Sequence, residues 1–444
     1  MNKKKGKIIG IALGCIVILL GGIFLYGYYN MPFISVHKPK PYQTSGEVIL
    51  SKELNELEVK ADVEQMIEIM ETTHPIFLEG ETKKYKEAKD RFLHDTNKNM
   101  TVDEFRFSVS RYLSSIQDGH TGLSWREMKF LDINWRYLDG QLILFDENNE
   151  STNKIVTKIN GVDIHNIINT VKELFPAENY VAESINYSIY SKSEEVLEYS
   201  GVDCTKDMFV TVMSGTSEED IQTKLHYGDN MYSMDYEISS KKIDDNTIYV
   251  KFGLCELNEN LNKVAEDLKQ AVDAGIENVI IDVRDNPGGA SRASNMLLDS
   301  VKIEPGHFGS IIRFSPLAQE QYGYWRKSGF ISYDRSNDVV RNENINLYIL
   351  TNEQTFSSAQ WLATWVKDGK LGTIVGRPSR NMPSSFGDVL QFELKNSKLD
   401  GQISYKKWTR PDETKDSERV LEPDIYVDYS EDALIKTIEL IKSK

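Results

Sequence analysis

Apolar residues recur at helical spacing in the first third of the chain. One stripe, over residues 54–70, stops at His74-Pro75, because the residue before a proline disfavours the α conformation. A second stripe begins at a capping-box signal, Thr101–Glu104, and is closed by Gly119, with His120 directly after it. The pattern predicts an N-terminal helical segment over residues 52–130 that ends in a polar turn.

Residues 131–245 are patterned differently and predict a β-rich second domain. Short strand-like runs at 141–145 and 155–159 are followed by an Asn-Gly turn. A helix is predicted over Ile164–Leu174, and a polar, tyrosine-rich stretch with no clear period follows it. We therefore expect this domain to contain little regular structure after its one helix.

From residue 246 onward, compact apolar runs alternate with helical stripes. Such alternation with short links predicts an α/β core, over residues 246–444, whose strands pair mainly in parallel. The predicted strands are residues 247–252, 278–284, 346–350 and 372–375, and the predicted helices are residues 261–272, 291–301 and 358–368.

The first 30 residues predict a membrane anchor. Four lysines between residues 3 and 7 precede an uncharged run from Ile8 to Tyr28, close to the ~20 residues that span a bilayer as a helix. Lysines on this side keep the N-terminus cytoplasmic and place the rest of the chain outside the cytoplasm. The run has no polar face, so we do not expect it to pack on the globular part. Residues 31–51 are predicted to be a linker. A cleaved signal peptide and a lipoprotein cysteine at Cys15 are the alternatives.

Composition argues against several classes of protein. The net charge of −16 over 444 residues argues against a nucleic-acid partner, which requires basic surface. A mean hydropathy of −0.43 argues against a protein with many membrane spans. The only cysteines are Cys15, Cys204 and Cys255, so neither a disulfide scaffold nor a cysteine-rich zinc site is expected, although Cys204 and Cys255 could pair. No metal-binding spacing occurs, and neither a metal nor another cofactor is predicted.

Three polar segments carry candidate chemistry. Ser357-Ser358 follows a buried strand and opens a helix, where free N–H groups favour a developing oxyanion; simple helix capping is the alternative. Asp285–Gly289 ends another buried strand, and its paired glycines either let backbone approach a ligand or form a plain turn. His120, in the turn Asp118–Thr121, can take a proton from a serine hydroxyl at neutral pH, or it can simply close its helix.

Together, these segments resemble the tail-specific, or C-terminal-processing, serine proteases, and in particular the branch with the tricorn core and the interphotoreceptor retinoid-binding protein repeats. The resemblance implies a crotonase/ClpP-like α/β core, often with a PDZ-like insertion, to which residues 131–245 would correspond. The matching stretches are SIQDGHT (115–121), VIIDVRDNPGG (279–289), LYILTNEQTFSSAQWLATWVKD (347–368), IVGRPS (374–379) and LEPDI (421–425).

The resemblance also implies roles for individual residues. The nucleophile falls on Ser357, or on Ser358 if the turn is shifted by one. Backbone N–H groups of Gly288, or Gly289, and of Ser358 would form the oxyanion hole. The base would be His120, since the lysine of another branch is replaced by Met382. A carboxylate that orients the histidine would be Glu418 or Glu422. Gln360 stands where the family usually has a glutamate.

The expected function is thus a membrane-anchored, extracytoplasmic serine endopeptidase. Its partners would be a protein or peptide substrate and the membrane, reached through the N-terminal helix. A catalytically inactive homologue that binds peptides or other ligands on the same fold remains an alternative. A crotonase-like acyl-transfer enzyme would use the same oxyanion chemistry, but the anchor argues against it because coenzyme A thioesters are cytosolic.

Overall fold

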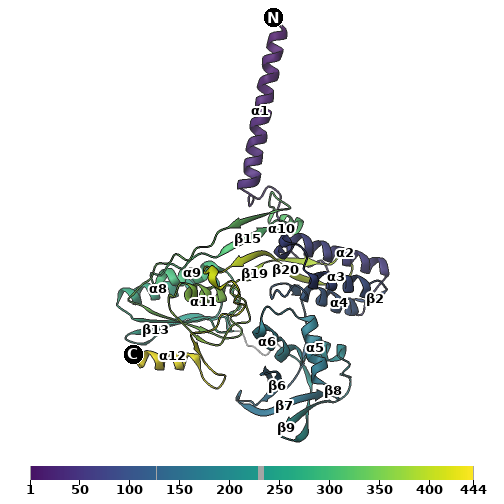
Figure 1. Ribbon diagram of the computed structural model, residues 1–444, viewed down its shortest axis with the longest axis vertical. Helices are drawn as coiled ribbons and strands as arrows, with labels where there is room; N and C mark the ends of the chain where they lie inside the picture. The colour runs from purple at the N-terminus through teal and green to yellow at the C-terminus, as the bar shows by residue number, and fades with distance from the viewer. Residues whose placement is uncertain (1, 127, 229–234, 444) are drawn as a thin grey trace.

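The computed structural model describes residues 2–126, 128–228 and 235–443, with side chains placed from residue 13 onward except at Asn30. The body consists of an α/β core, a helical segment on a second sheet, and a β-rich unit, and helix α1 projects away from all three (Figure 1). The α/β and helical parts predicted from the sequence are therefore present.

The core sheet is built from six strands in the order β12-β13-β14-β17-β18-β21. All neighbouring strands pair in parallel except β12, which runs antiparallel to β13 at one edge. The strands are β12 (Ile238–Asp244), β13 (Thr247–Phe252), β14 (Asn278–Asp282), β17 (Asn346–Thr351), β18 (Thr373–Gly376) and β21 (Ile425–Tyr426).

Helices cover both faces of this sheet because its strands are apolar on both sides. On one face, alternate residues such as Val279 and Ile281 pack with α8 (Glu259–Asp273), α9 (Ser291–Ser300) and α11 (Ser358–Asp368). The residue between them, Ile280, faces the other side and packs with α12 (Ala433–Lys442). Strands buried on both faces read as continuous apolar runs, which is why the sequence predicted them well.

A second sheet, in the order β16-β15-β20-β19, was not predicted. The N-terminal helices and α10 pack on it and form a single apolar core with it. The strands are β15 (Gly309–Arg313), β16 (Phe330–Tyr333), β19 (Phe386–Glu393), β20 (Asp400–Thr409) and the short β3 (Gly122–Leu123), which pairs with β20. The helices are α2 (Glu56–Thr73), η1 (Pro75–Glu79), α3 (Lys83–Asp95), α4 (Val102–Ser114) and α10 (Pro316–Tyr322). Beside them lies the short strand pair β1 (Glu53–Leu54) and β2 (Met100–Thr101).

The β-rich unit has a sheet in the order β10-β9-β7-β6-β5. Its elements are β5 (Trp135–Leu138), β6 (Gln141–Phe145), β7 (Ser151–Ile159), β8 (Val162–Asp163), α5 (Ile164–Leu174), α6 (Tyr180–Tyr190), α7 (Glu194–Tyr199), β9 (Met208–Ser214) and β10 (Ser217–Thr223). Beside it, β4 (Lys129–Leu131) pairs with β11 (Leu225–Tyr227). The short helix η2 (Glu413–Lys415) follows β20 and has no buried residue. The expectation of an irregular tyrosine-rich stretch was wrong, because that stretch forms α6 and α7. Val181, Ile185 and Ile189 provide a buried stripe with a period of four, and Asn179 caps the first of these helices.

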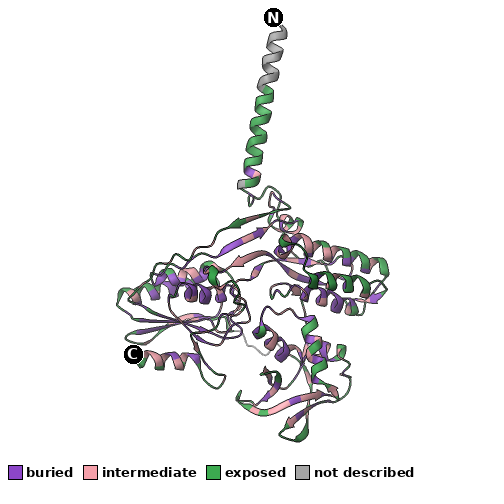
Figure 2. Cartoon of the chain, in the orientation of Figure 1, coloured by how far each residue is buried: buried purple, intermediate pink, exposed green. Residues whose placement is uncertain are grey.

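Helix α1 (Asn2–Asn30) covers the predicted anchor. Its described side chains from Leu13 to Tyr26 are all exposed (Figure 2). Residue 1 and the side chains of residues 2–12 lie outside the described part of the chain, so much of the predicted span is not covered. Within the residues that are described, no helix combines the length and the apolarity needed to cross a membrane. The anchor therefore stays a prediction.

The end of α1 and the segment after it are packed on the body, which was not expected. A Cβ added at Gly27 would lie 3.0 Å from the Trp325 ring, and Trp325 N donates a hydrogen bond to Ile34 O at 3.2 Å. Ser35 pairs with Tyr324 as an antiparallel bridge. The first part of the predicted linker is thus held in place, because its backbone groups find partners in the loop after α10.

Candidate active site

Ser357 lies in the turn between β17 and α11. Its φ of 51° and ψ of −123° place a side-chain-bearing residue in a conformation that L-residues rarely adopt. Its hydroxyl makes no capping hydrogen bond to the helix, although the residue is the N-cap. Simple capping, the alternative interpretation of this serine, is therefore wrong for Ser357, and its half-buried hydroxyl is available for chemistry.

Ser358 differs from its neighbour. Its Oγ donates a hydrogen bond to Gly289 O at 2.6 Å, and its side chain is buried. That bond links the start of α11 to the loop that follows β14. Ser358 therefore positions backbone, which favours Ser357 as the nucleophile over the register shifted by one.

The paired glycines lie directly against Ser357. Gly288 has a φ of 99°, and a Cβ built on it would lie 2.5 Å from Ser357 Cβ. The Gly288 N–H donates to the Asn286 side chain at 2.8 Å, whereas no hydrogen bond joins the N–H of Gly289 or of Ser358 to the described part of the chain. Of the predicted oxyanion donors, Gly289 and Ser358 are thus the free pair.

Cys255 fixes the far side of this loop. A Cβ on Gly289 would lie 2.3 Å from Cys255 O, so only glycine fits there. The Cys255 N–H bonds Gly288 O at 3.0 Å. Its thiol is free, as is that of Cys204, so the disulfide considered from the sequence is not formed. Burial raises the pKa of the Cys255 thiol to about 12, which leaves it unreactive.

His120 lies between two buried carboxylates. Its Nδ1 is 3.7 Å from Asp118 Oδ1 and 3.9 Å from Glu178 Oε1. Neither ring nitrogen has a hydrogen-bond partner in the described structure. Because both acids face Nδ1, the tautomer that carries its proton there is favoured, and Nε2 is left to accept a proton.

Burial and nearby charges shift the pKa values of His120, Asp118 and Glu178. Burial alone would lower the pKa of His120, but Asp118 and Glu178 outweigh it and raise that pKa above its usual range. Burial also acts to raise the pKa of Asp118, but the nearby His120 ring and the hydrogen-bonded His74 ring hold it well below its usual value. Burial raises the pKa of Glu178. Asp118 is thus the ionised partner of the histidine.

Asp118 is itself held in place from several directions. Its Oδ2 accepts hydrogen bonds from His74 Nε2 at 3.1 Å, Thr121 Oγ1 at 2.6 Å and Ser404 Oγ at 2.6 Å, and its Oδ1 accepts the His120 N–H at 2.9 Å. His74 Nδ1 accepts a backbone N–H, so its Nε2 carries the proton. The sequence marked Asp118 only as a neighbour of His120, whereas the structure gives it the orienting position.

Glu178 connects the histidine with the serine, and sequence reasoning missed it. Its Oε2 accepts a hydrogen bond from Nδ2 of Asn381 at 2.7 Å. Asn381 Oδ1 in turn accepts a hydrogen bond from the backbone N–H of Ser357 at 2.8 Å. Glu178 Oε1 also accepts the Gly119 N–H at 3.0 Å. Glu178 lies just before α6 in the tyrosine-rich stretch, where neither a motif nor a period drew attention to it.

The two acids proposed from the sequence make other contacts. Glu418 pairs with Arg410 at 2.8 Å, and Arg410 also binds the buried Asp368. Glu422 accepts a hydrogen bond from the hydroxyl of Tyr180 at 3.2 Å. Neither is among the carboxylates that act on His120, which are Asp118, Glu178 and Asp388.

In the described structure no hydrogen bond joins His120 to Ser357. The His120 ring packs on Phe356, the residue before the nucleophile, with ring centroids 4.5 Å apart. A cavity of about 320 Å³ opens beside this pair and is walled by aromatic residues, including Trp125, Phe175 and Tyr190. Catalytic hydrogen bonds often form only once substrate is bound.

The same three residues are the metal-binding candidate of the described chain. Ligand atoms of Asp118, His120 and Glu178 all lie within 4.8 Å of one another, which would suit a divalent cation. However, the carboxylates already accept hydrogen bonds from side chains and from backbone, as described above. Both carboxylates also face Nδ1 of His120, at 3.7 and 3.9 Å.

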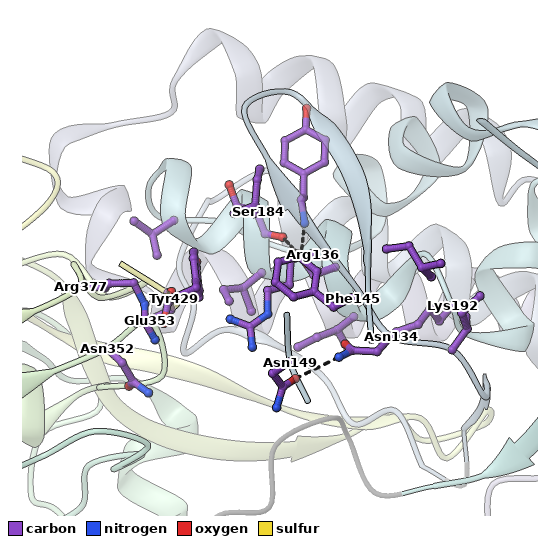
Figure 3. A pocket seen from close by; sticks show the side chains of 18 of the residues that line it. Asn134, Arg136, Phe145, Asn149, Ser184, Lys192, Asn352, Glu353, Arg377 and Tyr429 are labelled. Atoms are coloured by element: carbon purple, nitrogen blue, oxygen red, sulfur yellow. Dashed lines mark hydrogen bonds and ion pairs between the residues drawn. The ribbon is translucent and has the colours of Figure 1, made fainter. Parts of the chain in front are cut away.

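A larger cavity, of about 1290 Å³, separates the β-rich unit from the core. Figure 3 shows Arg136, Arg377, Glu353 and Tyr429 along its wall. The two guanidinium groups lie over the Tyr429 ring at 4.5 and 4.3 Å. Asn352 also lines it and bonds Asp285, so the cavity touches both turns that form the candidate oxyanion hole.

Comparisons with known proteins show what this α/β chain is similar to. Residues 247–427 match the model of peptidase family S41. A probable CtpA-like serine protease of Staphylococcus aureus is 23% identical over 240 residues, which are 50% of this chain and 40% of that protein. The chain thus corresponds to less than half the length of that relative.

Solved structures share the fold. The mature form of CPAF in complex with lactacystin matches 87% of this chain and 99% of its own with a TM-score of 0.61, at 12% identity. Another structure of mature CPAF gives a TM-score of 0.57 over 83% of this chain and 93% of its own, also at 12% identity. These findings agree with the resemblance found from the motifs: residues 247–427 are similar to peptidase family S41, which includes serine-type peptidases.

Proposed function

We propose that this protein is a serine endopeptidase in which Ser357 is the nucleophile and His120 the general base. The observation that carries the proposal is the free, strained Ser357 at the start of α11, beside the N–H groups of Gly289 and Ser358. Asp118 and Glu178 hold Nδ1 of His120, which leaves Nε2 to act. The substrate is a protein or peptide.

The reaction follows from these positions. His120 Nε2 takes the proton of Ser357 Oγ as the oxygen attacks the peptide carbonyl carbon, and the oxyanion forms between the two N–H groups. The protonated histidine then gives its proton to the leaving amine. Water, deprotonated by the same histidine, releases the acyl group. Loss of one oxyanion donor typically costs ~3 kcal/mol, about a hundredfold in rate.

A fluorophosphonate probe tests this assignment. We expect the wild-type chain to be labelled, the Ser357→Ala variant not to be labelled, and the Ser358→Ala variant to keep the label. Labelling that depends on Ser358 alone would shift the nucleophile by one residue. A wild-type chain that neither labels nor cleaves peptides would instead be an inactive, ligand-binding homologue, for which the large cavity is the obvious place to bind.

We also propose that α1 anchors the body at the outer surface of the cell membrane. The support is the uncharged run from Ile8 to Tyr28 behind a lysine cluster, together with the exposed side chains that α1 presents from Leu13 on. Flotation of the full chain with lipid vesicles tests the anchoring. Protease added to intact cells should digest the body but spare the N-terminal lysines, and a body shielded until lysis would invert the topology.

A further inference from the structure

The end of α1 meets the body at a cluster of aromatic rings. Phe24 and Trp325 lie edge to face with centroids 4.9 Å apart, and Tyr28 lies 6.2 Å from the same indole. Trp325 belongs to the loop between α10 and β16. Figure 1 shows α10 below the end of α1. Three residues of this loop, Trp325, Arg326 and Lys327, therefore sit where the helix leaves the body.

Arg326 occupies an unusual position in this cluster. Its side chain lies over the rings of Phe314, Tyr28 and Tyr29, at 4.7, 5.6 and 6.0 Å from their centroids. The residue is only 9% exposed. No hydrogen bond or ion pair joins it to any residue that the structure describes, and its Nε is buried without a partner.

A guanidinium in this state lacks the anion that normally accompanies it. Burying a charge is costly unless it is paired, and stacking on rings replaces only part of its hydration. The protein has many carboxylates, with a net charge of −16. The acid on the adjacent helix, Glu320, pairs with Lys40 at 3.7 Å rather than with Arg326. The missing partner is therefore expected to come from outside the described chain.

The position of Arg326 indicates which anion that is. Beyond the aromatic cluster, the side chains of α1 that the structure describes, from Leu13 to Ile23, are exposed and uncharged, including Leu20 at 59% and Ile23 at 61% exposure. If those side chains are in lipid, the cluster lies at the headgroup level, where tryptophan and tyrosine concentrate. The planar fork of an arginine matches the oxygens of a phosphate, which are the anions present at that level.

We propose that Arg326 binds the phosphate of a membrane phospholipid, flanked by Trp325 and the tyrosines at the end of α1. Lys327, which is exposed beside it, adds a second positive charge that favours anionic lipids. The site fixes the height and orientation of the body above the membrane. This inference rests on the proposed anchoring of α1.

The test uses the full chain in detergent micelles, titrated with dioctanoyl phosphatidylglycerol and followed by native mass spectrometry. The dissociation constant of the first bound lipid is expected to be about fivefold larger for Arg326→Gln. For Arg326→Lys it should lie between those of Arg326→Gln and the wild type, because lysine keeps the charge but lacks the planar fork. Arg292→Gln removes an exposed arginine from α9, and it should leave lipid binding unchanged. Labelling by the fluorophosphonate probe checks that each variant is folded.

A measurement on the wild-type chain alone tests whether the lipid phosphate is recognised, even if Arg326 variants fail to fold. Dioctanoylglycerol, which has the same tails but no phosphate, should bind at least several-fold more weakly than the phospholipid. Equal binding of the two lipids, or equal binding by Arg326→Gln, would overturn the proposal. Displacement of the lipid by inorganic phosphate at low millimolar concentration would make this a site for free phosphate and would also overturn it.

Flotation of the same preparation with vesicles separates the two proposals. A chain that floats but fails the lipid tests is anchored without this headgroup site. A chain that does not float has lost the basis for both, whatever its affinity for short lipids. A chain that floats and shows the phosphate-dependent, Arg326-dependent affinity carries the site as described.

Discussion

Glu178 and Asn381 share a hydrogen bond of 2.7 Å that joins the two halves of the candidate active site. On one side, Asn381 holds the backbone N–H of Ser357; on the other, Glu178 lies against the ring of His120. The two residues are 203 positions apart in the sequence. One buried acid–amide pair therefore links the backbone of the proposed nucleophile with the surroundings of the proposed base.

Replacing the acid should be costly for catalysis. In Glu178→Gln, one carboxylate oxygen becomes an amide that faces N–H donors of Asn381, Met382 or Gly119. Hydrogen bonds to charged groups are worth ~1.5–3 kcal/mol, so kcat/KM should fall about tenfold to a hundredfold. Steady-state kinetics on a peptide substrate measures this.

The acids first proposed from the sequence provide the matched controls. Glu418→Gln and Glu422→Gln should each leave kcat/KM within about twofold, because those side chains bind Arg410 and Tyr180 rather than His120. A large loss of kcat/KM in either of these two variants, with Glu178→Gln fully active, would mean that the orienting carboxylate has been assigned to the wrong part of the chain.

The pH profile should report the charges around His120. Only the neutral imidazole can accept the serine proton, so activity rises with pH as His120 loses its proton. Since the pKa of His120 is raised by Asp118 and Glu178, the midpoint should lie above the ordinary value of ~6.5. The dependence of kcat/KM on pH measures it.

Asp118→Asn should move this midpoint to lower pH and reduce the plateau as well, because the ring loses both a negative charge and its orientation. Asp388→Asn removes a more distant, exposed charge that also raises the pKa of His120, so it should shift the midpoint less and keep the plateau. A midpoint that is the same in all three proteins would show that another group titrates.

Local pattern was sufficient to predict the core of the fold. β13 (Thr247–Phe252), α5 (Ile164–Leu174) and α11 (Ser358–Asp368) have the bounds read from the sequence. Each has a strong period or an unbroken apolar run, and their partners follow closely along the chain. The sheet around β15 and β20 was missed, and its central pairing joins distant segments, as Gly309 pairs with Thr409. No local signal carries such a register.

Some residues of the candidate site could likewise be predicted from the sequence, and others could not. Ser357, His120 and the glycines lie in turns that follow well-patterned elements, so their motifs stood out. Glu178 could not be found, because its role comes from a fold that brings the start of α6 against the turn after β18. The choice between Gly288 and Gly289 as donor also needed the structure, since it depends on a single hydrogen bond from Gly288 to Asn286.

Gln360 offers a test of stability rather than activity. It is fully buried on α11, and neither its Oε1 nor its Nε2 has a partner in the described part of the chain. Gln360→Met keeps the shape and removes the unsatisfied amide, so it should stabilise the core by ~1–3 kcal/mol and raise its melting temperature. Gln360→Glu, which restores the residue suggested by the family resemblance, should lower it. Calorimetry of the two variants gives the comparison, and a melting temperature unchanged in both would mean that the amide is satisfied in solution.

Gly288→Ala should abolish activity through a clash rather than through backbone strain alone. The new Cβ would lie 2.5 Å from Ser357 Cβ and 2.8 Å from Phe356 O, so the turn of the nucleophile must move. Gly275→Ala is the matched control: Gly275 has a similar φ of 88°, but nothing lies within 4 Å of the added methyl group. It should cost about 1–2 kcal/mol of stability while the fluorophosphonate probe still labels Ser357. Measured side by side, loss of labelling in Gly288→Ala with retention in Gly275→Ala isolates the contact between Gly288 and Ser357. Equal labelling of both variants would show that the loop after β14 can withdraw from the serine without consequence, and the oxyanion hole would then have to be sought elsewhere.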